Sequence, residues 1–380
     1  MTKAPTSPPT AQRPRRTQRR PVADFEQLLR DGSKAARAAH LEYARLDAPG
    51  FGRKRRGKSF AYHDERGRAI RSSSVVARIR KLAIPPAWTQ VWICPSPLGH
   101  VQATGRDAKG RKQYRYHERF RALRDGAKYL HILRFGYKLP ELRRTLARDL
   151  RRPGLEQSKV LSAVIELMQR TCMRVGNDRY AEQNGSYGLT TLRDRHAKIR
   201  GSELEFHFKG KSGKVHHVRL DDARLARIVR SCRDVPGQRL FQYEGNDGRF
   251  HAVTSGDVND YLRRVTGEPF SAKDFRTWSG TLLAVHALAA SEPCTSISAK
   301  RRAVKQALEG VSAELGNTIA ICRKSYVHPA VIDQYTSGEL VATFRKALQS
   351  ARRRPVRGLR QPESVALRWL EALPALPARL

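Results

Sequence analysis

The stretch LGNTIAICRKSY ends on Tyr326 and places Asn317 nine residues before it. A tyrosine hydroxyl can attack phosphorus, and an amide can donate a hydrogen bond to an oxygen that gains charge, although an amide cannot titrate. Three other stretches add basic groups: Arg174 in CMRVGNDRY, Lys211 in FKGKSGK and Arg276 in KDFRTWSG. A guanidinium can grip two phosphate oxygens at once, and a lysine can protonate a leaving oxygen. Together, these five side chains could break a phosphodiester bond without a metal ion.

Each of these residues also has an ordinary structural explanation. Arg174 could cap the end of the preceding helix, Lys211 could be a solvated turn residue, and Tyr326 could be half-buried packing. Composition alone does not separate the five from the 74 Lys and Arg and the 12 Tyr of the chain. The chemical interpretation therefore depends on the whole set and on its local contexts.

The charge balance indicates a polyanionic partner. Lys and Arg number 74 against 35 Asp and Glu, which gives the 380 residues a net charge of +39. Nucleic acid is the commonest partner for such a surplus, and an anionic membrane is the alternative. The chain has no long basic amphipathic helix with a wide apolar face, and no apolar run reaches the ~18 residues of a membrane span. We therefore expect a nucleic-acid partner and no membrane.

Cysteine and histidine spacing argues against disulfides and zinc. The five cysteines show no C-x-x-C pair, and their number is odd. The adjacent His216 and His217 fall on a predicted strand, which would point their rings to opposite faces. We expect a reduced, intracellular chain with no metal site, located in the cytoplasm with the nucleoid.

The elements that must position the reactive groups begin with two N-terminal regions. Residues 1–22 are rich in Arg and Pro and contain no acidic residue, so we predict a disordered basic arm. Residues 23–124 are predicted to form a small β-rich domain. Its strand patterns include WTQVWIC and a pair of strands around the turn from Asp107 to Gly110.

From residue 125 to 350 the pattern becomes mainly helical. One helix is predicted to bury a single face and to stop near Gly176; the residues of that face are Leu161, Val164, Ile165, Met168 and Cys172. A β-hairpin is predicted over 203–220, with its turn in GKSG. Further helices are predicted at 221–231, 256–265, 278–290, 300–314 and 338–350. Residues 351–380 are predicted to be a basic C-terminal extension with one short helix, and the fold class is α+β.

The set of motifs, in this order, resembles the type IB DNA topoisomerases in their short poxvirus and bacterial form. The matching stretches are IPPAWTQVWICPSPLGHVQATGRDAKGRKQYRYHERF, RVGNDRYAEQNGSYGLTTLRDRH, FHFKGKSGKVHHV, KDFRTWSGT and LGNTIAICRKSYVHP. They spread over about 50–345, so the resemblance covers most of the chain.

The resemblance implies a mechanism and a role for each residue. Tyr326 would attack one strand of duplex DNA and form a 3′-phosphotyrosyl bond; strand rotation and religation would then relax supercoils without ATP or metal. Arg174 and Arg276 would hold the scissile phosphate. Lys211 would protonate the leaving 5′-oxygen, with Lys273 assisting the proton transfer.

One position departs from many family members. They carry a histidine where this chain has Asn317, and the bacterial branch resembles this sequence in having asparagine there. We interpret Asn317 as an oxyanion donor and not as an acid or base. His328, two residues after Tyr326, is the alternative for that role.

The resemblance also implies double-stranded DNA as the partner, held by a monomer whose β-rich and helical domains together form a clamp. Tyr114 and Tyr116 resemble family residues that touch DNA near the cleavage site, with strand packing as the alternative. Tyr180 and Thr191 match catalytic-domain positions that contact DNA. Gly188 is interpreted as a turn residue.

Two other classes of protein remain open. A tyrosine recombinase or integrase has a related Arg–Lys–Arg–Tyr set, but usually carries histidine where this chain has Lys273, and the β-rich N-terminal domain is of the topoisomerase type. A non-enzymatic basic DNA-packaging protein would explain the charge but not the ordered motifs.

Overall fold

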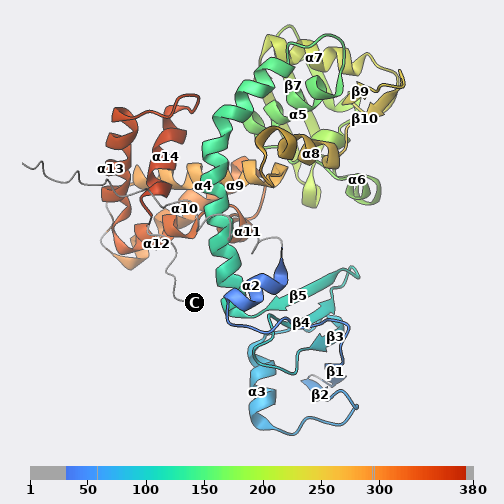
Figure 1. Ribbon diagram of the computed structural model, residues 1–380, viewed down its shortest axis with the longest axis vertical. Helices are drawn as coiled ribbons and strands as arrows, with labels where there is room; N and C mark the ends of the chain where they lie inside the picture. Colours follow the sequence, from blue (N-terminus) through green and yellow to red (C-terminus); the bar gives the residue numbers. More distant parts are fainter. Residues whose placement is uncertain (1–30, 58, 293, 295, 374–380) are drawn as a thin grey trace, which may run out of the picture. The chain divides into compact units, whose positions relative to one another are not determined.

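The computed structural model describes residues 31–57, 59–292, 294 and 296–373. The basic arm predicted at 1–22 lies outside these residues. The described chain divides into two compact units, the first reaching His131 and the second beginning at Ile132. Helix α4 (Glu118–Asp149) contributes residues to both units (Figure 1).

The first unit is built on an antiparallel sheet of five strands in the order β2-β1-β3-β4-β5. The strands are β1 (Phe51–Arg56), β2 (Ser59–His63), β3 (Thr89–Ile93), β4 (Val101–Arg106) and β5 (Lys112–Tyr116). The unit also contains α2 (Gly32–Ala38) and α3 (Ser73–Lys81). The predicted turn between β4 and β5 is closed by Asp107, whose carboxylate accepts hydrogen bonds from the backbone of Lys109 and Arg111, each at 3.0 Å.

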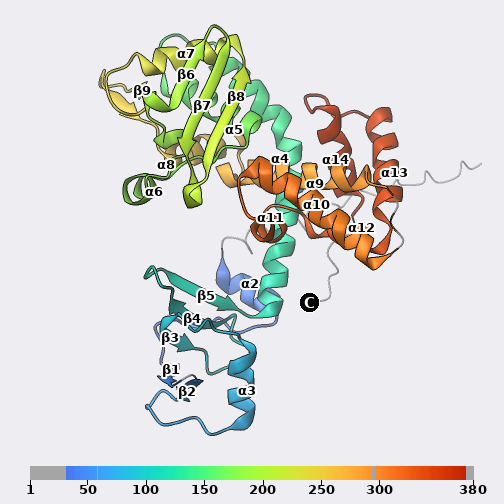
Figure 2. The ribbon, with the colours of Figure 1, turned by 180° about the vertical axis from the view of Figure 1, so that it is seen from behind.

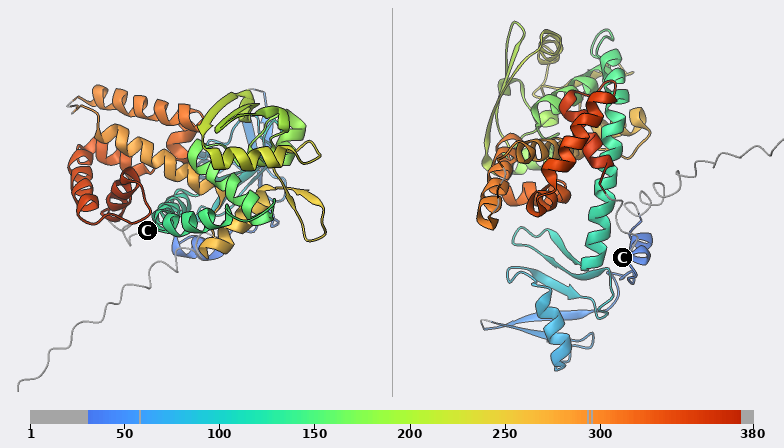
Figure 3. Two further views of the ribbon diagram at one scale, coloured as in Figure 1. Left: turned by 90° about the horizontal axis from the view of Figure 1, so that it is seen from above. Right: turned by 90° about the vertical axis from the view of Figure 1, so that its left-hand side faces the viewer.

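The second unit is mainly helical, and α9 and α10 lie side by side within it (Figure 3). Its helices after α4 are α5 (Gln157–Thr171), α6 (Asp178–Asn184), α7 (Ala223–Arg233), α8 (Ser255–Thr266), α9 (Ala272–Ala289), α10 (Ile297–Leu315), α11 (Ile319–Ser325), α12 (Pro329–Ser337), α13 (Leu340–Arg353) and α14 (Gln361–Glu371). Short 3₁₀ turns occur at Leu189–Thr191, Asp194–His196 and Lys211–Gly213.

Helix α5 differs from its prediction in two ways. It is buried almost all round and not on one face, because other elements of the unit cover it on several sides. It also ends at Thr171 and not near Gly176. Cys172 adopts the left-handed conformation (φ 53°), which lets its N–H cap the carbonyl of Met168. The chain therefore leaves the helix two residues before Arg174.

The hairpin predicted over 203–220 is present as β7 (Glu203–Lys209) and β8 (Val215–Asp221). A third strand, β6 (Ala197–Arg200), extends it to a sheet in the order β6-β7-β8, and α7 packs beside β6 and β7 (Figure 2). A second small pair, β9 (Gln242–Glu244) with β10 (Phe250–Ala252), was not expected from the sequence. The α+β class predicted for the chain is confirmed.

The last described helix belongs to the core of the second unit. Trp369 of α14 is fully buried and donates a hydrogen bond from Nε1 to Gln334 Oε1 of α12 at 3.0 Å. Within the region predicted as a basic extension, residues 361–371 therefore help to build the helical unit.

Candidate active site

Arg174 lies on the short segment that follows α5. Its backbone carbonyl accepts a hydrogen bond from Leu189 N at 2.9 Å, so this segment runs against the stretch that contains Gly188. A Cβ on Gly188 would lie 2.7 Å from the Arg174 carbonyl oxygen. Gly188 has an extended φ of −146° and directly precedes the 3₁₀ turn Leu189–Thr191. Its carbonyl accepts the turn's hydrogen bond from Thr191 N at 2.8 Å, which agrees with its interpretation as a turn residue. The missing side chain also permits the close backbone approach to Arg174.

Arg276 lies in the first turns of α9 and is only 5% exposed. Its guanidinium donates to two backbone carbonyls, that of Cys172 at the end of α5 and that of Leu315 at the end of α10, the latter at 2.6 Å. Its Cζ also lies 5.1 Å from the centre of the Tyr326 ring. Arg276 therefore joins three separate parts of the site, and its buried Nε has no hydrogen-bond partner among the described residues.

Asn317 follows directly on α10. Gly316 takes the left-handed conformation that ends this helix (φ 58°), which turns Asn317 back toward Arg174. The Asn317 side-chain oxygen accepts a hydrogen bond from Arg174 Nη2. Its amide nitrogen Nδ2 is buried and has no partner among the residues that the structure describes. A buried donor without an acceptor is costly, so this amide is suited to a bound oxygen atom.

Tyr326 lies at the C-terminal end of α11 and is half-buried against the core. Its carbonyl accepts a hydrogen bond from Thr281 Oγ1 at 3.3 Å. A Cβ on Gly280 would lie 2.8 Å from that same carbonyl oxygen, so α9 can approach Tyr326 closely only because residue 280 is glycine. Helix α9 thus positions both Arg276 and the tyrosine.

His328 has a structural position. Its Nδ1 accepts a hydrogen bond from Ala330 N at 3.1 Å and caps α12, while its ring meets Trp369 edge-on at 6.0 Å. Asn317, and not His328, therefore lies on Arg174.

The electrostatics of the site favour an anion. Arg174 and Arg276 are neighbours of like charge, and neither forms an ion pair with a carboxylate within the described residues. Burial, followed by the charge of Arg276, lowers the pKa of Arg174 to about 10. Arg174 therefore remains charged at neutral pH, and a phosphate between the two arginines would offset their mutual repulsion.

Lys211 and Lys273 lie at exposed positions outside this group. Lys211 opens the 3₁₀ turn at the tip of the β7–β8 hairpin, next to Ser212, whose φ is 64°. Lys273 lies on α9, three residues before Arg276. Among the described residues, neither lysine side chain has a hydrogen-bond or ion-pair partner. The structure therefore brings together Arg174, Arg276, Asn317 and Tyr326, and leaves both lysines in solvent.

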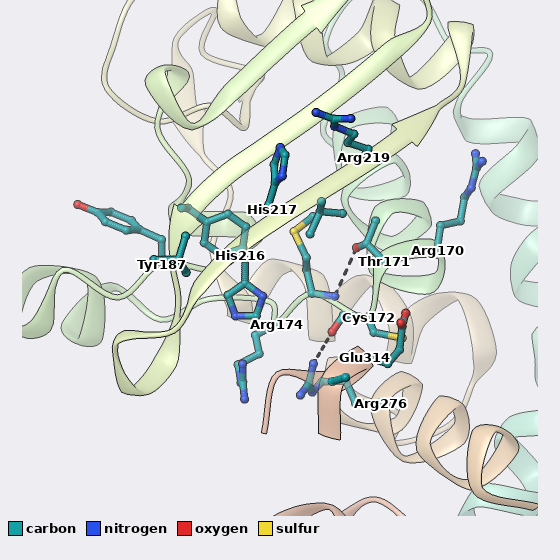
Figure 4. Close-up of a pocket in the computed structure, with 15 residues that line it drawn as sticks. Arg170, Thr171, Cys172, Arg174, Tyr187, His216, His217, Arg219, Arg276 and Glu314 are labelled. Atoms are coloured by element: carbon teal, nitrogen blue, oxygen red, sulfur yellow. Dashed lines mark hydrogen bonds between the residues drawn. The ribbon is translucent and has the colours of Figure 1, made fainter. Parts of the chain in front are cut away.

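Sequence reasoning missed two hairpin residues beside this group. Lys214 donates from Nζ to the Asn317 carbonyl at 3.1 Å, and the His216 ring lies against Gly316. The only signal for Lys214 was the second lysine of GKSGK. A pocket of about 400 Å³ lies here, and its lining includes Arg174, Arg276 and His216 (Figure 4).

The four predicted DNA-contact residues have different exposures. Tyr180 on α6 is 48% exposed, whereas Thr191 is 1% exposed. The Thr191 hydroxyl donates to the Gly188 carbonyl and accepts from the Gly188 N–H, so its hydrogen bonds hold the backbone next to Arg174. In the first unit, the rings of Tyr114 and Tyr116 are stacked 5.8 Å apart, and Tyr114 is 40% exposed.

The described part of the chain contains no group of three or more His, Cys, Asp or Glu side chains placed to hold a metal ion. None of its helices combines the length and the apolar character needed to cross a membrane.

Comparison with known proteins identifies the family of the chain. The family model for the catalytic core of eukaryotic DNA topoisomerase I matches residues 117–353, and that for the N-terminal domain of bacterial DNA topoisomerase IB matches residues 59–107. The chain is 33% identical over 295 residues to DNA topoisomerase 1B of Acanthamoeba polyphaga mimivirus, covering 75% of this chain and 87% of the relative. It is 20% identical over 253 residues to DNA topoisomerase 1 of Rabbit fibroma virus (strain Kasza), covering 65% and 76%. The chain therefore belongs to the type IB DNA topoisomerases, isomerases that here take the short bacterial and viral form with an N-terminal domain and a catalytic core.

Proposed function

We propose that this enzyme relaxes supercoiled duplex DNA by cutting one strand through a 3′-phosphotyrosyl intermediate, letting the cut strand rotate, and resealing it. The observation that carries the proposal is that Arg174, Arg276 and Asn317 lie together next to Tyr326. Among the described residues, Asn317 Nδ2 has no hydrogen-bond acceptor. Two guanidinium groups and one amide can bind the non-bridging oxygens of a phosphodiester.

In the cleavage step, Tyr326 Oη forms a bond to phosphorus and the bond from phosphorus to the 5′-oxygen breaks. The phenol proton leaves to solvent, and Lys211 donates a proton to the departing 5′-oxygen. Arg174, Arg276 and Asn317 stabilise the charge that gathers on the non-bridging oxygens. Religation reverses each transfer, so the energy of the cleaved bond is kept in the phosphotyrosine and no ATP is consumed.

The roles of Lys211 and Lys273 require movement on DNA binding. Both side chains are exposed, and long flexible lysines can reach a phosphate that enters between the hairpin and α9. We assign proton donation to Lys211, and we assign to Lys273 the role of assisting this proton transfer.

We assign DNA contacts to Tyr114, Tyr116 and Tyr180, whose rings offer an apolar face and a hydroxyl. Thr191 acts through Gly188, because its hydroxyl is already used there. The enzyme would bind double-stranded DNA as a monomeric clamp in the bacterial cytoplasm.

The test is a relaxation assay with supercoiled plasmid and EDTA, without ATP. Relaxation, together with a protein adduct on the 3′ end of the cut strand, is expected. Gel retardation without relaxation would instead support a packaging protein, and joining of paired sites would support a recombinase. An adduct on the 5′ end would contradict the proposed chemistry.

A further inference from the structure

The tip of the β7–β8 hairpin is attached to the backbone of the active site. Within the tip, Gly210 N donates to the Lys214 carbonyl at 2.7 Å, which closes the turn that carries Lys211. From the same turn, Lys214 Nζ reaches across to the carbonyl of Asn317 at 3.1 Å. That carbonyl also accepts from Ser312 Oγ at 2.7 Å, so it is held in place from α10. The hairpin tip is therefore joined to the residue that orients Arg174.

A second contact supports the same attachment. The His216 ring stacks on Phe208 at 5.1 Å and 12°. A Cβ on Gly316 would lie 2.6 Å from the ring, and one on Gly210 would lie 2.5 Å from it. The ring thus fits between two glycines, one on the hairpin and one at the end of α10, and any side chain at either position would push the hairpin away.

His216 is suited to this packing as a neutral ring. Burial, followed by the charges of Arg174, Arg276 and Lys214, lowers the pKa of His216 below its usual value. At neutral pH the ring therefore adds no fourth cation to this cluster.

The Lys211 side chain forms no hydrogen bond or ion pair with any residue that the structure describes. It is exposed, three residues before Lys214 on the same turn. The position of the turn therefore determines which atoms the Lys211 ammonium can reach. We infer that Lys214 is a positioning residue, whose hydrogen bond to the Asn317 carbonyl sets the hairpin tip so that Lys211 can protonate the leaving 5′-oxygen. The inference rests on the proposed function, because it needs Lys211 as the acid.

The experiment measures single-turnover cleavage of one suicide duplex, with either oxygen or sulfur as the bridging 5′ atom. Sulfur leaves as a thiolate and needs no acid. The variants of the full chain are Lys211→Ala, Lys214→Met, Lys214→Arg and the double variant Lys211→Ala/Lys214→Met. Lys209→Met is the matched control: it removes the same charge from an exposed position of the same hairpin, where no side-chain bond to Asn317 exists.

We expect Lys214→Met to slow cleavage of the oxygen substrate by about 10- to 100-fold, since misplacing a catalytic group by ~1 Å can cost 10²-fold. The sulfur substrate should be cut at close to the wild-type rate. Lys214→Arg should recover most of the oxygen rate, because a guanidinium can donate to the same carbonyl, and Lys209→Met should cleave like wild type. The double variant should be no slower than Lys211→Ala alone, because Lys214 acts only through Lys211.

Other outcomes would overturn the inference. Multiplying effects in the double variant would make Lys214 an independent phosphate ligand. A loss that sulfur does not restore would place its effect on Asn317 or on the arginines, and an equal loss in Lys209→Met would reduce its role to general charge. None of these results contradicts the proposed function if the sulfur substrate restores the cleavage rate of Lys211→Ala. Failure of that restoration would remove Lys211 as the acid, and the inference with it.

Discussion

Arg174 and Arg276 are the residues around which the site is organised. Each guanidinium is committed to backbone carbonyls or to the Asn317 side chain, with no carboxylate partner among the described residues. A carboxylate would compete with the phosphate for these donors, whereas neutral carbonyls orient them without cancelling their charge. The positive charge of the two guanidinium groups therefore stays available to bind an anion.

The proposed role of Tyr326 as the nucleophile can be tested by removing one atom. Tyr326→Phe should bind duplex DNA with unchanged affinity but neither nick nor relax it, because only the attacking oxygen is lost. The measurements are equilibrium binding and trapping of the covalent adduct on a suicide substrate. Tyr137→Phe is the control, because it removes the same hydroxyl from a tyrosine that is 47% exposed on α4. This variant should cleave DNA at the wild-type rate. An adduct formed by Tyr326→Phe would move the nucleophile to another residue.

The amide of Asn317 can be tested by its substitution with Ala and His. If Nδ2 binds a non-bridging oxygen in the transition state, Asn317→Ala should slow cleavage and religation by a similar factor. The loss of one such donor costs roughly 2.7–4 kcal/mol, or about 10²–10³-fold in rate. Asn317→His should retain substantial activity and acquire a pH dependence near the imidazole pKa of about 6.5. Rate against pH for the three proteins is the measurement, and a full-rate Ala variant would remove Asn317 from the site.

At the scale of elements, the ends of helices bring the reactive groups together. Arg276 donates to the last carbonyl of α10 and to the residue that follows α5, while Tyr326 closes α11. Helix α14 lies in the same unit and is tied to α4 by an ion pair: Glu363 is 1% exposed and accepts two hydrogen bonds from Arg143, each at 2.7 Å. Burial alone would raise the pKa of Glu363, but Arg143 and Arg360 outweigh it and hold this pKa at about 2.

This ion pair predicts a pH-dependent stability. The folded-state pKa of Glu363 lies below its unfolded value of about 4.3, so its contribution is complete above that pH and is lost as the pH falls toward about 2. Glu363→Gln should lower the free energy of unfolding by about 3 kcal/mol at pH 7, the lower end of the cost of breaking a buried pair. The difference from wild type should shrink below about pH 4.

Denaturant unfolding followed by tryptophan fluorescence is the measurement. Glu309→Gln is the matched control, because Glu309 forms a 3.7 Å ion pair with Lys305 on the surface of α10 and should cost less than ~1 kcal/mol. Equal losses in the two variants at pH 7 would show that the buried pair has no special weight.

At the scale of the whole molecule, the net charge of +39 governs the encounter with DNA. Lysine and arginine side chains that neutralise phosphates release condensed counterions, so affinity falls as salt rises. We expect the affinity of the enzyme for duplex DNA to fall by at least ~10³-fold between about 50 and 200 mM salt, as for proteins that make 6–10 phosphate contacts. Fluorescence anisotropy on one duplex is the measurement. A flat affinity over this range would contradict binding dominated by phosphate contacts.

Local patterns in the sequence were sufficient for the α+β class, for the β7–β8 hairpin and for most helices of the second unit, because strand alternation and helical periodicity are properties of short windows. The motifs also identified Arg174, Arg276, Asn317 and Tyr326 as candidates. The left-handed end of α5 at Cys172 was not predicted, since glycine and asparagine, and not cysteine, are the residues that usually adopt this conformation at a helix end.

Only the tertiary structure decided which groups meet. Arg174 and Asn317 are 143 residues apart, and Lys214 and Asn317 are 103 apart, yet both pairs are in hydrogen-bond contact. The structure also placed the Thr191 hydroxyl on Gly188 and showed that Lys214, and not Lys211, contacts Asn317. No window of sequence contains these contacts, because they arise when α5, α9, α10 and the hairpin pack on one core. The residue types set the available chemistry, and packing sets the distances at which that chemistry can occur.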